Sequence, residues 1–157
     1  MLAKRRLIVI SAMVIAVALI ILTICLPHTP KLVLTNAKTG ENYGSFPLED
    51  GTFSVTFVHS VNKSPVSDIY EIRDGVIYMT GTVYYGFGAG VPDELSEGQK
   101  LTFGENGEMI ISDMDLRIDD LVYVVGTVSD HILRIGNKET SLRDLCGRNS
   151  SVSFTVK

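Results

Sequence analysis

Short runs of alternating apolar and polar residues, separated by turn signals, fill most of the chain after residue 30. The clearest run is 52–58, TFSVTFV, in which Phe53, Val55 and Phe57 fall on one face and hydroxyl residues on the other. A period of two is typical of a half-buried β-strand. The pair Asp74-Gly75 separates two further runs and predicts a hairpin turn.

Eight or nine strands are expected from these runs. They cover residues 31–35, 52–58, 67–73, 76–85, 100–103, 109–112, 121–128, 132–135 and 151–156. One helical turn is expected at 140–145, and Gly147 ends it. The runs at 121–128 and 132–135 are expected to form a hairpin around Ser129-Asp130. The spacing predicts an all-β fold, an antiparallel sandwich or small barrel, whose strand order cannot be read from the pattern.

The pattern near the start of the chain is different. Residues 7–26 contain no charge, and 13 of these 20 residues are Ile, Leu or Val. Twenty residues at about 1.5 Å rise span about 30 Å, the thickness of a bilayer's hydrocarbon core. Residues 7–26 are therefore expected to form one transmembrane helix in contact with the lipid bilayer. Pro27 and Pro30 are expected to end it.

This segment divides the chain into two expected parts. Residues 1–30 are the cytoplasmic tip, the transmembrane anchor and a tether, and residues 31–157 are an exported β domain. A cleaved signal peptide is the main alternative, but the apolar stretch is longer than in such peptides and no small-residue cleavage site follows it. A lipoprotein needs a small residue before its cysteine, whereas Ile24 precedes Cys25.

Charge is unevenly distributed along the chain. Lys4, Arg5 and Arg6 precede the apolar segment and are expected to stay in the cytoplasm. The expected location is thus the cytoplasmic membrane, as a single-pass protein with the β domain outside the cytoplasm. Residues 31–157 contain 11 basic and 18 acidic residues, a formal charge of −7. Nucleic acid is therefore not expected as a partner.

The first distinctive polar stretch follows the clearest strand. His59 ends that strand, and Asp68 lies on the next one. If the strands pair through the loop 62–65, His59 comes near Ser67 and Asp68, and the carboxylate would favour the imidazolium and fix its tautomer. A structural His–Asp pair, a ligand contact and general-base catalysis remain open. Ser60 points away from His59, so the two cannot form a catalytic dyad.

The second distinctive stretch is the Gly-rich run 84–92, YYGFGAGVP. Three glycines in five residues allow backbone N–H groups to converge on an anion or a partner. The spacing matches neither the dinucleotide fingerprint nor the phosphate loop. A tight crossing of backbones is the structural alternative.

No cofactor, metal site or complete catalytic set is expected. The three histidines, His28, His59 and His131, are scattered along the chain. The acidic cluster at 113–120 lacks the oxygen ligand and the glycine of a calcium loop, so a solvated turn is expected there. The only two cysteines lie in the apolar segment and near the end of the β domain, so no disulfide is expected.

Taken together, the two polar stretches resemble the bacterial and archaeal family known as domain of unknown function 1850. The resemblance covers roughly residues 32–154. It is carried by His59-Ser60-Val61, by Ser64-Pro65-Val66 with Asp68 and Tyr70, and by Phe87-Gly88-Ala89-Gly90-Val91-Pro92. Where the family carries glutamate, this chain has the shorter acid Asp68 and the uncharged Asn62.

The resemblance implies a small secreted or membrane-anchored protein without an established activity, commonly encoded beside tripartite transporters of the TAXI type. It implies an accessory role, with the transporter's membrane subunits or its solute-binding protein as partners. The candidate ligand- or partner-binding residues are His59, Ser60, Asp68, Gly88, Ala89, Gly90 and Pro92. A domain that binds or senses a small carboxylate or another ligand is the alternative. An enzyme with His59 as base and Asp68 orienting it is a third hypothesis.

Overall fold

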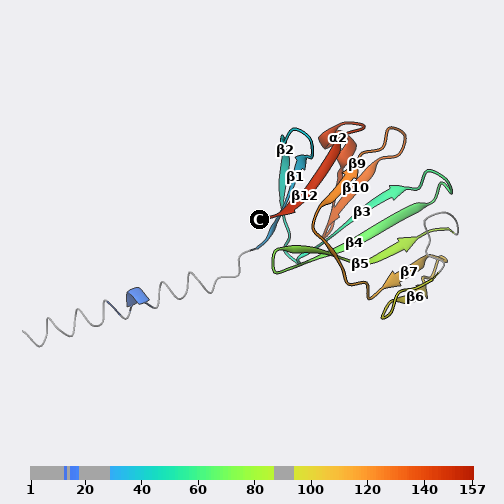
Figure 1. The fold of residues 1–157 in the computed structure, drawn as a ribbon, viewed down its shortest axis with the longest axis horizontal. Helices are drawn as coiled ribbons and strands as arrows, with labels where there is room; N and C mark the ends of the chain where they lie inside the picture. The colour runs from blue at the N-terminus through green and yellow to red at the C-terminus, as the bar shows by residue number, and fades with distance from the viewer. Residues whose placement is uncertain (1–12, 14, 18–28, 87–93) are drawn as a thin grey trace, which may run out of the picture.

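The computed structural model of the chain describes residues 13, 15–17, 29–86 and 94–157. The predicted transmembrane segment, residues 7–26, lies almost wholly outside the described residues. No helix among the described residues is long and apolar enough to cross a membrane. In the folded part, from residue 29 onward, the regular secondary structure is almost entirely β-strand, with one short helix (Figure 1).

The strands form two antiparallel sheets. The first has the order β2-β1-β12-β9 and the second the order β11-β10-β3-β4-β5-β7-β6, with β8 paired to β5 beside β7. The strands of the first sheet are β1 (Lys31–Asn36), β2 (Asn42–Pro47), β9 (Leu121–Val124) and β12 (Ser151–Val156). Those of the second are β3 (Thr52–Val58), β4 (Pro65–Arg73), β5 (Val76–Tyr84), β6 (Lys100–Phe103), β7 (Met109–Ser112), β8 (Leu116–Ile118), β10 (His131–Ile135) and β11 (Lys138–Ser141).

Both strand orders end in unpaired edges within the described part of the chain, so neither sheet closes into a barrel. The prediction of an all-β antiparallel fold is confirmed, and its small-barrel form is not adopted.

Local chemistry explains several connections. Asp74 and Gly75, with φ of 51° and 76°, make the two-residue turn between β4 and β5. At Gly81 a side chain would lie 2.9 Å from the carbonyl oxygen of Ile111, so only glycine lets β7 approach.

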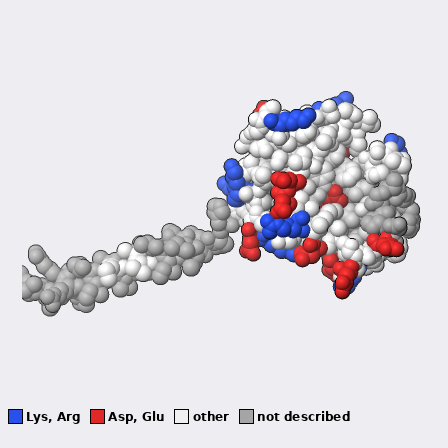
Figure 2. All heavy atoms as spheres, viewed as in Figure 1, with Lys and Arg blue, Asp and Glu red and all other residues white. Residues whose placement is uncertain are grey.

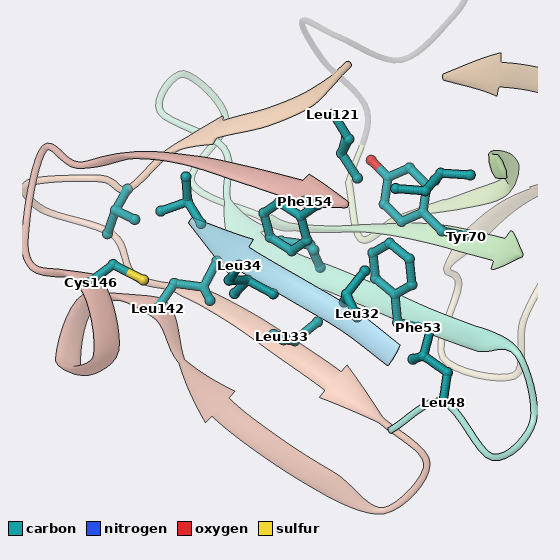
Figure 3. Close-up of a cluster of buried hydrophobic side chains, with 14 residues drawn as sticks. Leu32, Leu34, Leu48, Phe53, Tyr70, Leu121, Leu133, Leu142, Cys146 and Phe154 are labelled. Atoms are coloured by element: carbon teal, nitrogen blue, oxygen red, sulfur yellow. The ribbon is translucent and has the colours of Figure 1, made fainter. Parts of the chain in front are cut away.

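The two sheets share one hydrophobic core. Phe53 of β3 stacks on Tyr70 of β4, with ring centroids 4.9 Å apart, and on Phe154 of β12 in the other sheet, at 6.0 Å. Figure 3 shows these rings beside the leucines of β1 and β10. Burial of such side chains is the main stabilising term, worth about 1.5–3 kcal/mol for each one.

The helix α2 (Leu142–Cys146) covers one end of this core through Leu142 and Cys146. Ser141 caps its start by accepting a hydrogen bond from the Asp144 amide, and Gly147, with φ of 83°, follows its end. The predicted helical turn is thus confirmed. Burial raises the pKa of the Cys146 thiol to about 11, so this cysteine behaves as a core residue.

The predicted hairpin around Ser129-Asp130 is wrong. β9 pairs with β12 in the first sheet, whereas β10 pairs with β3 and β11 in the second, so residues 125–130 cross between the sheets. A side chain at Gly126 would lie 2.2 Å from the carbonyl oxygen of Ser129, which shows how tight this crossing is. Alternation identified the two strands, but it carries no information on which strands they pair with.

Each end of the folded part has a distinct set of loops. The chain enters at Pro30, whose carbonyl accepts a hydrogen bond from the Leu48 amide at 2.9 Å. The backbones of Lys31 and Lys157 also exchange hydrogen bonds there. We call this the proximal end. β3 begins there and runs to the loop 59–64 at the opposite, distal end (Figure 1). The crossing 125–130 is also distal, because the Val58 amide donates to the Ser129 hydroxyl.

Acidic and basic side chains alternate over the face shown in Figure 2, where they form no continuous basic patch. Most of the acidic cluster at 113–120 is paired rather than free. Its carboxylates form ion pairs with basic side chains, Asp113 with Lys100, Asp115 with Arg73 and Asp119 with Arg117. All of these groups are at least two-fifths exposed, so each pair contributes little to stability.

Candidate functional site

Strand alternation carries a carboxylate into the space between the two sheets. On β4 the buried side chains of Val66 and Tyr70 face the core, and Asp68 lies between them on the same face. Its neighbours in the sheet are Val55 of β3 and the fully buried Thr82 of β5. A carboxylate in this position needs hydrogen-bond donors to offset the loss of water.

Tyr123 of the other sheet supplies the main donor. Its hydroxyl lies 2.6 Å from Asp68 Oδ2 and 2.6 Å from the Tyr70 hydroxyl, and Thr82 Oγ1 donates to Asp68 Oδ1 at 3.1 Å. Since the single Tyr123 proton goes to Asp68, Tyr70 must donate to Tyr123. We call Asp68, Tyr70, Thr82 and Tyr123 the inter-sheet polar cluster.

The two phenols of the cluster remain protonated donors. Burial is the main cause that raises the pKa of Tyr70, and the charge of Asp68 adds to it. Burial likewise raises the pKa of Tyr123 strongly, with further contributions from Tyr70 and Asp68. A hydrogen bond from a neutral phenol to a carboxylate is stronger than one between two neutral groups. The cluster therefore joins the sheets with directional bonds.

His131 lies next to the cluster. Its ring stacks on Phe57, with centroids 5.1 Å apart, and lies 5.6 Å from the ring of Tyr123. Its Nδ1 accepts a hydrogen bond from the Gly126 amide at 3.3 Å. Burial lowers the pKa of His131 more than the nearby charges of Asp130 and Asp68 raise it. The folded protein thus favours the neutral imidazole, which is the form that accepts from Gly126.

His59 does not meet Asp68. The register pairs Asp68 with Val55, and His59 lies four residues farther along, roughly 13 Å at the usual strand rise. Its backbone amide instead donates to the Ser64 carbonyl at 2.9 Å, and its Nδ1 accepts from the Val61 amide at 3.3 Å. The expected proximity of His59 to Ser67 and Asp68 is therefore wrong, because the strands pair up to Val58 and His59 falls in the loop.

The remaining sequence candidates lie at the distal end or outside the described residues. Ser60 is exposed on the loop 59–64. Gly88, Ala89, Gly90 and Pro92 lie outside the described residues. The start of the Gly-rich run does meet the loop: a side chain at Gly86 would lie 3.3 Å from the Ser64 hydroxyl, and the Tyr85 amide donates to the Pro65 carbonyl. The loop 59–64 therefore lies beside the start of the Gly-rich run 84–92.

Two polar atoms of this loop are buried without a partner. Asn62 Nδ2 and Ser64 Oγ have no hydrogen-bond partner among the described residues. Asn62 Oδ1, in contrast, accepts from the Ser64 amide at 3.3 Å. Buried donors of this kind are uncommon and typically mark a place where a ligand, water or partner completes the bonding.

Comparison with protein families matches residues 53–142 to a family described as domain of unknown function (DUF1850). The matched residues cover more than half of the chain. The chain belongs to the DUF1850 family. The DUF1850 segment contains the loop 59–64 and three sheet strands that carry Asp68, Thr82 and His131. Comparison with curated proteins finds no match, and comparison with solved structures finds none either.

Sequence reasoning missed most of the inter-sheet polar cluster. Tyr123 lies 55 residues from Asp68 and in the other sheet, so only the strand order brings them together. Thr82 faces Asp68 only because the β4–β5 register shifts by one residue between Ile69 and Tyr70; counted from the Asp74-Gly75 turn alone, Gly81 would stand opposite Asp68. Both Asp68 oxygens accept hydrogen bonds from this cluster, and the described surroundings place no histidine in hydrogen-bond contact with the carboxylate. The arrangement favours rigidity over proton transfer.

Removing the Tyr123 hydroxyl should weaken the contact between the sheets. Tyr123→Phe leaves one Asp68 oxygen and the Tyr70 hydroxyl without their partner, so we expect the free energy of unfolding to fall by about 1–3 kcal/mol. Tyr85→Phe is the matched control, because Tyr85 is exposed at the distal end. Urea denaturation of both variants measures the difference. Equal stability of the two variants would show that the bond to Asp68 contributes nothing.

Stability should fall in mild acid because of His131. The unfolded chain takes up a proton near the ordinary pKa of histidine, about 6.5, whereas the folded chain resists it. The contribution of neutral His131 to the free energy of unfolding is thus fully present above that pH, and it is lost as the pH falls through the lowered pKa of the folded state. We expect His131→Gln to reduce the loss between about pH 7 and pH 5. Urea denaturation at both pH values measures it, and an unchanged loss would contradict the assignment to His131.

Proposed function

We propose that this DUF1850 protein is a membrane-anchored accessory protein that assists a tripartite solute-uptake transporter, and that its β domain acts by binding another protein. The anchor is the apolar segment 7–26, and the β domain lies outside the cytoplasm. The proposal rests on the sequence for the anchor and on the family resemblance for the transporter. The fold contributes the surface through which the β domain would bind.

The observation that carries the proposal is the apolar surface of the distal end. Val61 follows the family residues His59 and Ser60 and is 68% exposed, and Val128 on the crossing 125–130 is 90% exposed. Val58 and Tyr85 are exposed at the same end, where the Val58 amide donates to the Ser129 hydroxyl and the Tyr85 amide to the Pro65 carbonyl. We call Val58, Val61, Tyr85 and Val128 the distal apolar surface. Exposed apolar side chains gathered on loops next to family residues are typical of a protein-binding site.

The position of this surface favours a partner in the aqueous phase. The chain enters the folded part at Pro30, and β3 carries it across the full length of the sheet before the loop 59–64 begins. Seven residues of strand span about 23 Å, so the distal apolar surface faces away from the point where the tether arrives. Among the transporter's proteins, the solute-binding protein is the partner that this geometry favours.

Cross-linking should identify the partner. A photoreactive residue at Val61 is expected to form a covalent adduct with the solute-binding protein in cells, whereas one at the proximal, exposed Asp119 is not. Val61→Asp should reduce co-purification of that partner about tenfold, because a charge replaces an apolar contact. Unchanged solute uptake in a deletion strain, together with no adduct at Val61, would overturn the proposal.

A second candidate function is binding of a small carboxylate at the loop 59–64. The specific observation in its favour is the pair of buried donors, Asn62 Nδ2 and Ser64 Oγ, the second of which lies where Gly86 approaches the loop. Donors without partners are what a carboxylate needs. Asp68 lies outside this group of donors, so its charge does not oppose an anion there.

A panel of small carboxylates should reveal such a site through the melting temperature. A ligand present at 100 times its Kd stabilises the folded state by about 2.7 kcal/mol, which raises Tm by several degrees. Asn62→Asp replaces a donor with a like charge and should abolish the shift. Asn42→Asp, in the exposed start of β2, should keep it. A shift of the same size in Asn62→Asp would rule out this site.

A further inference from the structure

We propose that the proximal end holds a separate binding site for a small amphipathic amine, a molecule with an apolar body and a cationic head group. The site is a cavity of about 300 Å³ between the open edges of the two sheets. It lies apart from the distal apolar surface and does not depend on the function proposed above. A volume of this size is at the lower end for sites that hold small ligands.

Apolar side chains form the floor of the cavity. Leu133 is fully buried, and Phe46 and Ile135 are half-buried and pack against the core. Thr140 pairs with Leu133 across the β10–β11 ladder, so its side chain stands on the same face. This floor would take an aromatic ring or a short aliphatic chain, because such groups lose little by leaving water.

Two carboxylates and one amine stand at the rim. Glu49 and Asp50 come from the turn between β2 and β3, and Lys138 starts β11. Among the described residues, none of the three takes part in an ion pair. The rim thus carries a net charge of −1 with two free carboxylates on one side. This charge favours an ammonium head over a carboxylate, and the ring of Phe46 adds a surface that attracts cations.

The strand order explains why the cavity stays open. β2 is the edge of the first sheet and β11 the edge of the second, so no described strand covers the space between them. Pro47, which ends β2 and lines the cavity, cannot donate a backbone hydrogen bond to an added strand. The edge is thereby protected from strand addition, while the cavity behind it remains accessible to a small molecule.

Three probes that share one ring and differ in the head group test the proposal: 2-phenylethylamine, 2-phenylethanol and 3-phenylpropionate. The full chain in lipid nanodiscs is titrated with each probe, with empty nanodiscs to correct for partitioning into lipid. We expect the methyl NMR signals of Leu133 and Ile135 to shift with the amine while those of the distal Val61 do not. We also expect the amine to bind at least about fivefold more tightly than the propionate.

Variants separate the contributions of the rim and the floor. The double substitution Glu49→Gln and Asp50→Asn removes two exposed charges and should reduce the preference for the amine about fivefold or more. Asp119→Asn with Asp120→Asn makes the same charge change in another exposed turn and should leave the preference intact. Thr140→Phe should fill the cavity and weaken all three probes. Equal binding of amine and propionate, or shifts that persist in Thr140→Phe, would overturn the proposal.

Discussion

The hydrogen bond between Tyr123 and Asp68 fixes how the two sheets meet. A carboxylate carried between sheets by strand alternation must find donors there, and a buried acceptor without them costs about 1–3 kcal/mol or more. Tyr123 lies on the edge strand β9, so this bond ties the edge of the first sheet to β4 of the second, beside the ring contacts of Tyr123 with Phe57 and His131. Because the crossing 125–130 starts where β9 ends, the bond also sets the position of one distal loop.

Local chemistry explains which parts of the fold could be predicted from the sequence. The strand 52–58 and the turn Asp74-Gly75 were found correctly, since a period of two and a left-handed turn are properties of a few consecutive residues. β8 and β11 were missed because they have only three and four residues, and β2 because it contains glycine and proline. The hairpin at Ser129-Asp130 failed for a different reason. Two strands that follow each other in the sequence usually pair, but here β9 pairs with β12 and β10 pairs with β3.

The site illustrates the same limit at the level of single residues. Asp68 was singled out because it was expected to meet His59 across the ladder, but the register pairs it with Val55, four residues before His59. The sequence contains no sign that Tyr123 faces Asp68, since 55 residues and a change of sheet separate them. His59 was expected to end the strand and face Ser67 and Asp68, whereas the loop begins at that residue and its imidazole accepts a hydrogen bond from the Val61 amide. Long-range pairing, rather than composition, decides which polar residues meet.

The two ends of the folded part can carry separate interactions because the exposed residues that would decide binding at each end are not those that hold the sheets together. The distal apolar surface consists of exposed loop side chains, and the rim of the proximal cavity consists of exposed charges beside the two sheet edges. Substitutions there remove no core contact, so their effects on binding can be measured without loss of the fold. The inter-sheet polar cluster joins the two sheets through hydrogen bonds. A ligand at one end could therefore influence the other only by shifting one sheet against the other, and the bond from Tyr123 to Asp68 opposes that movement.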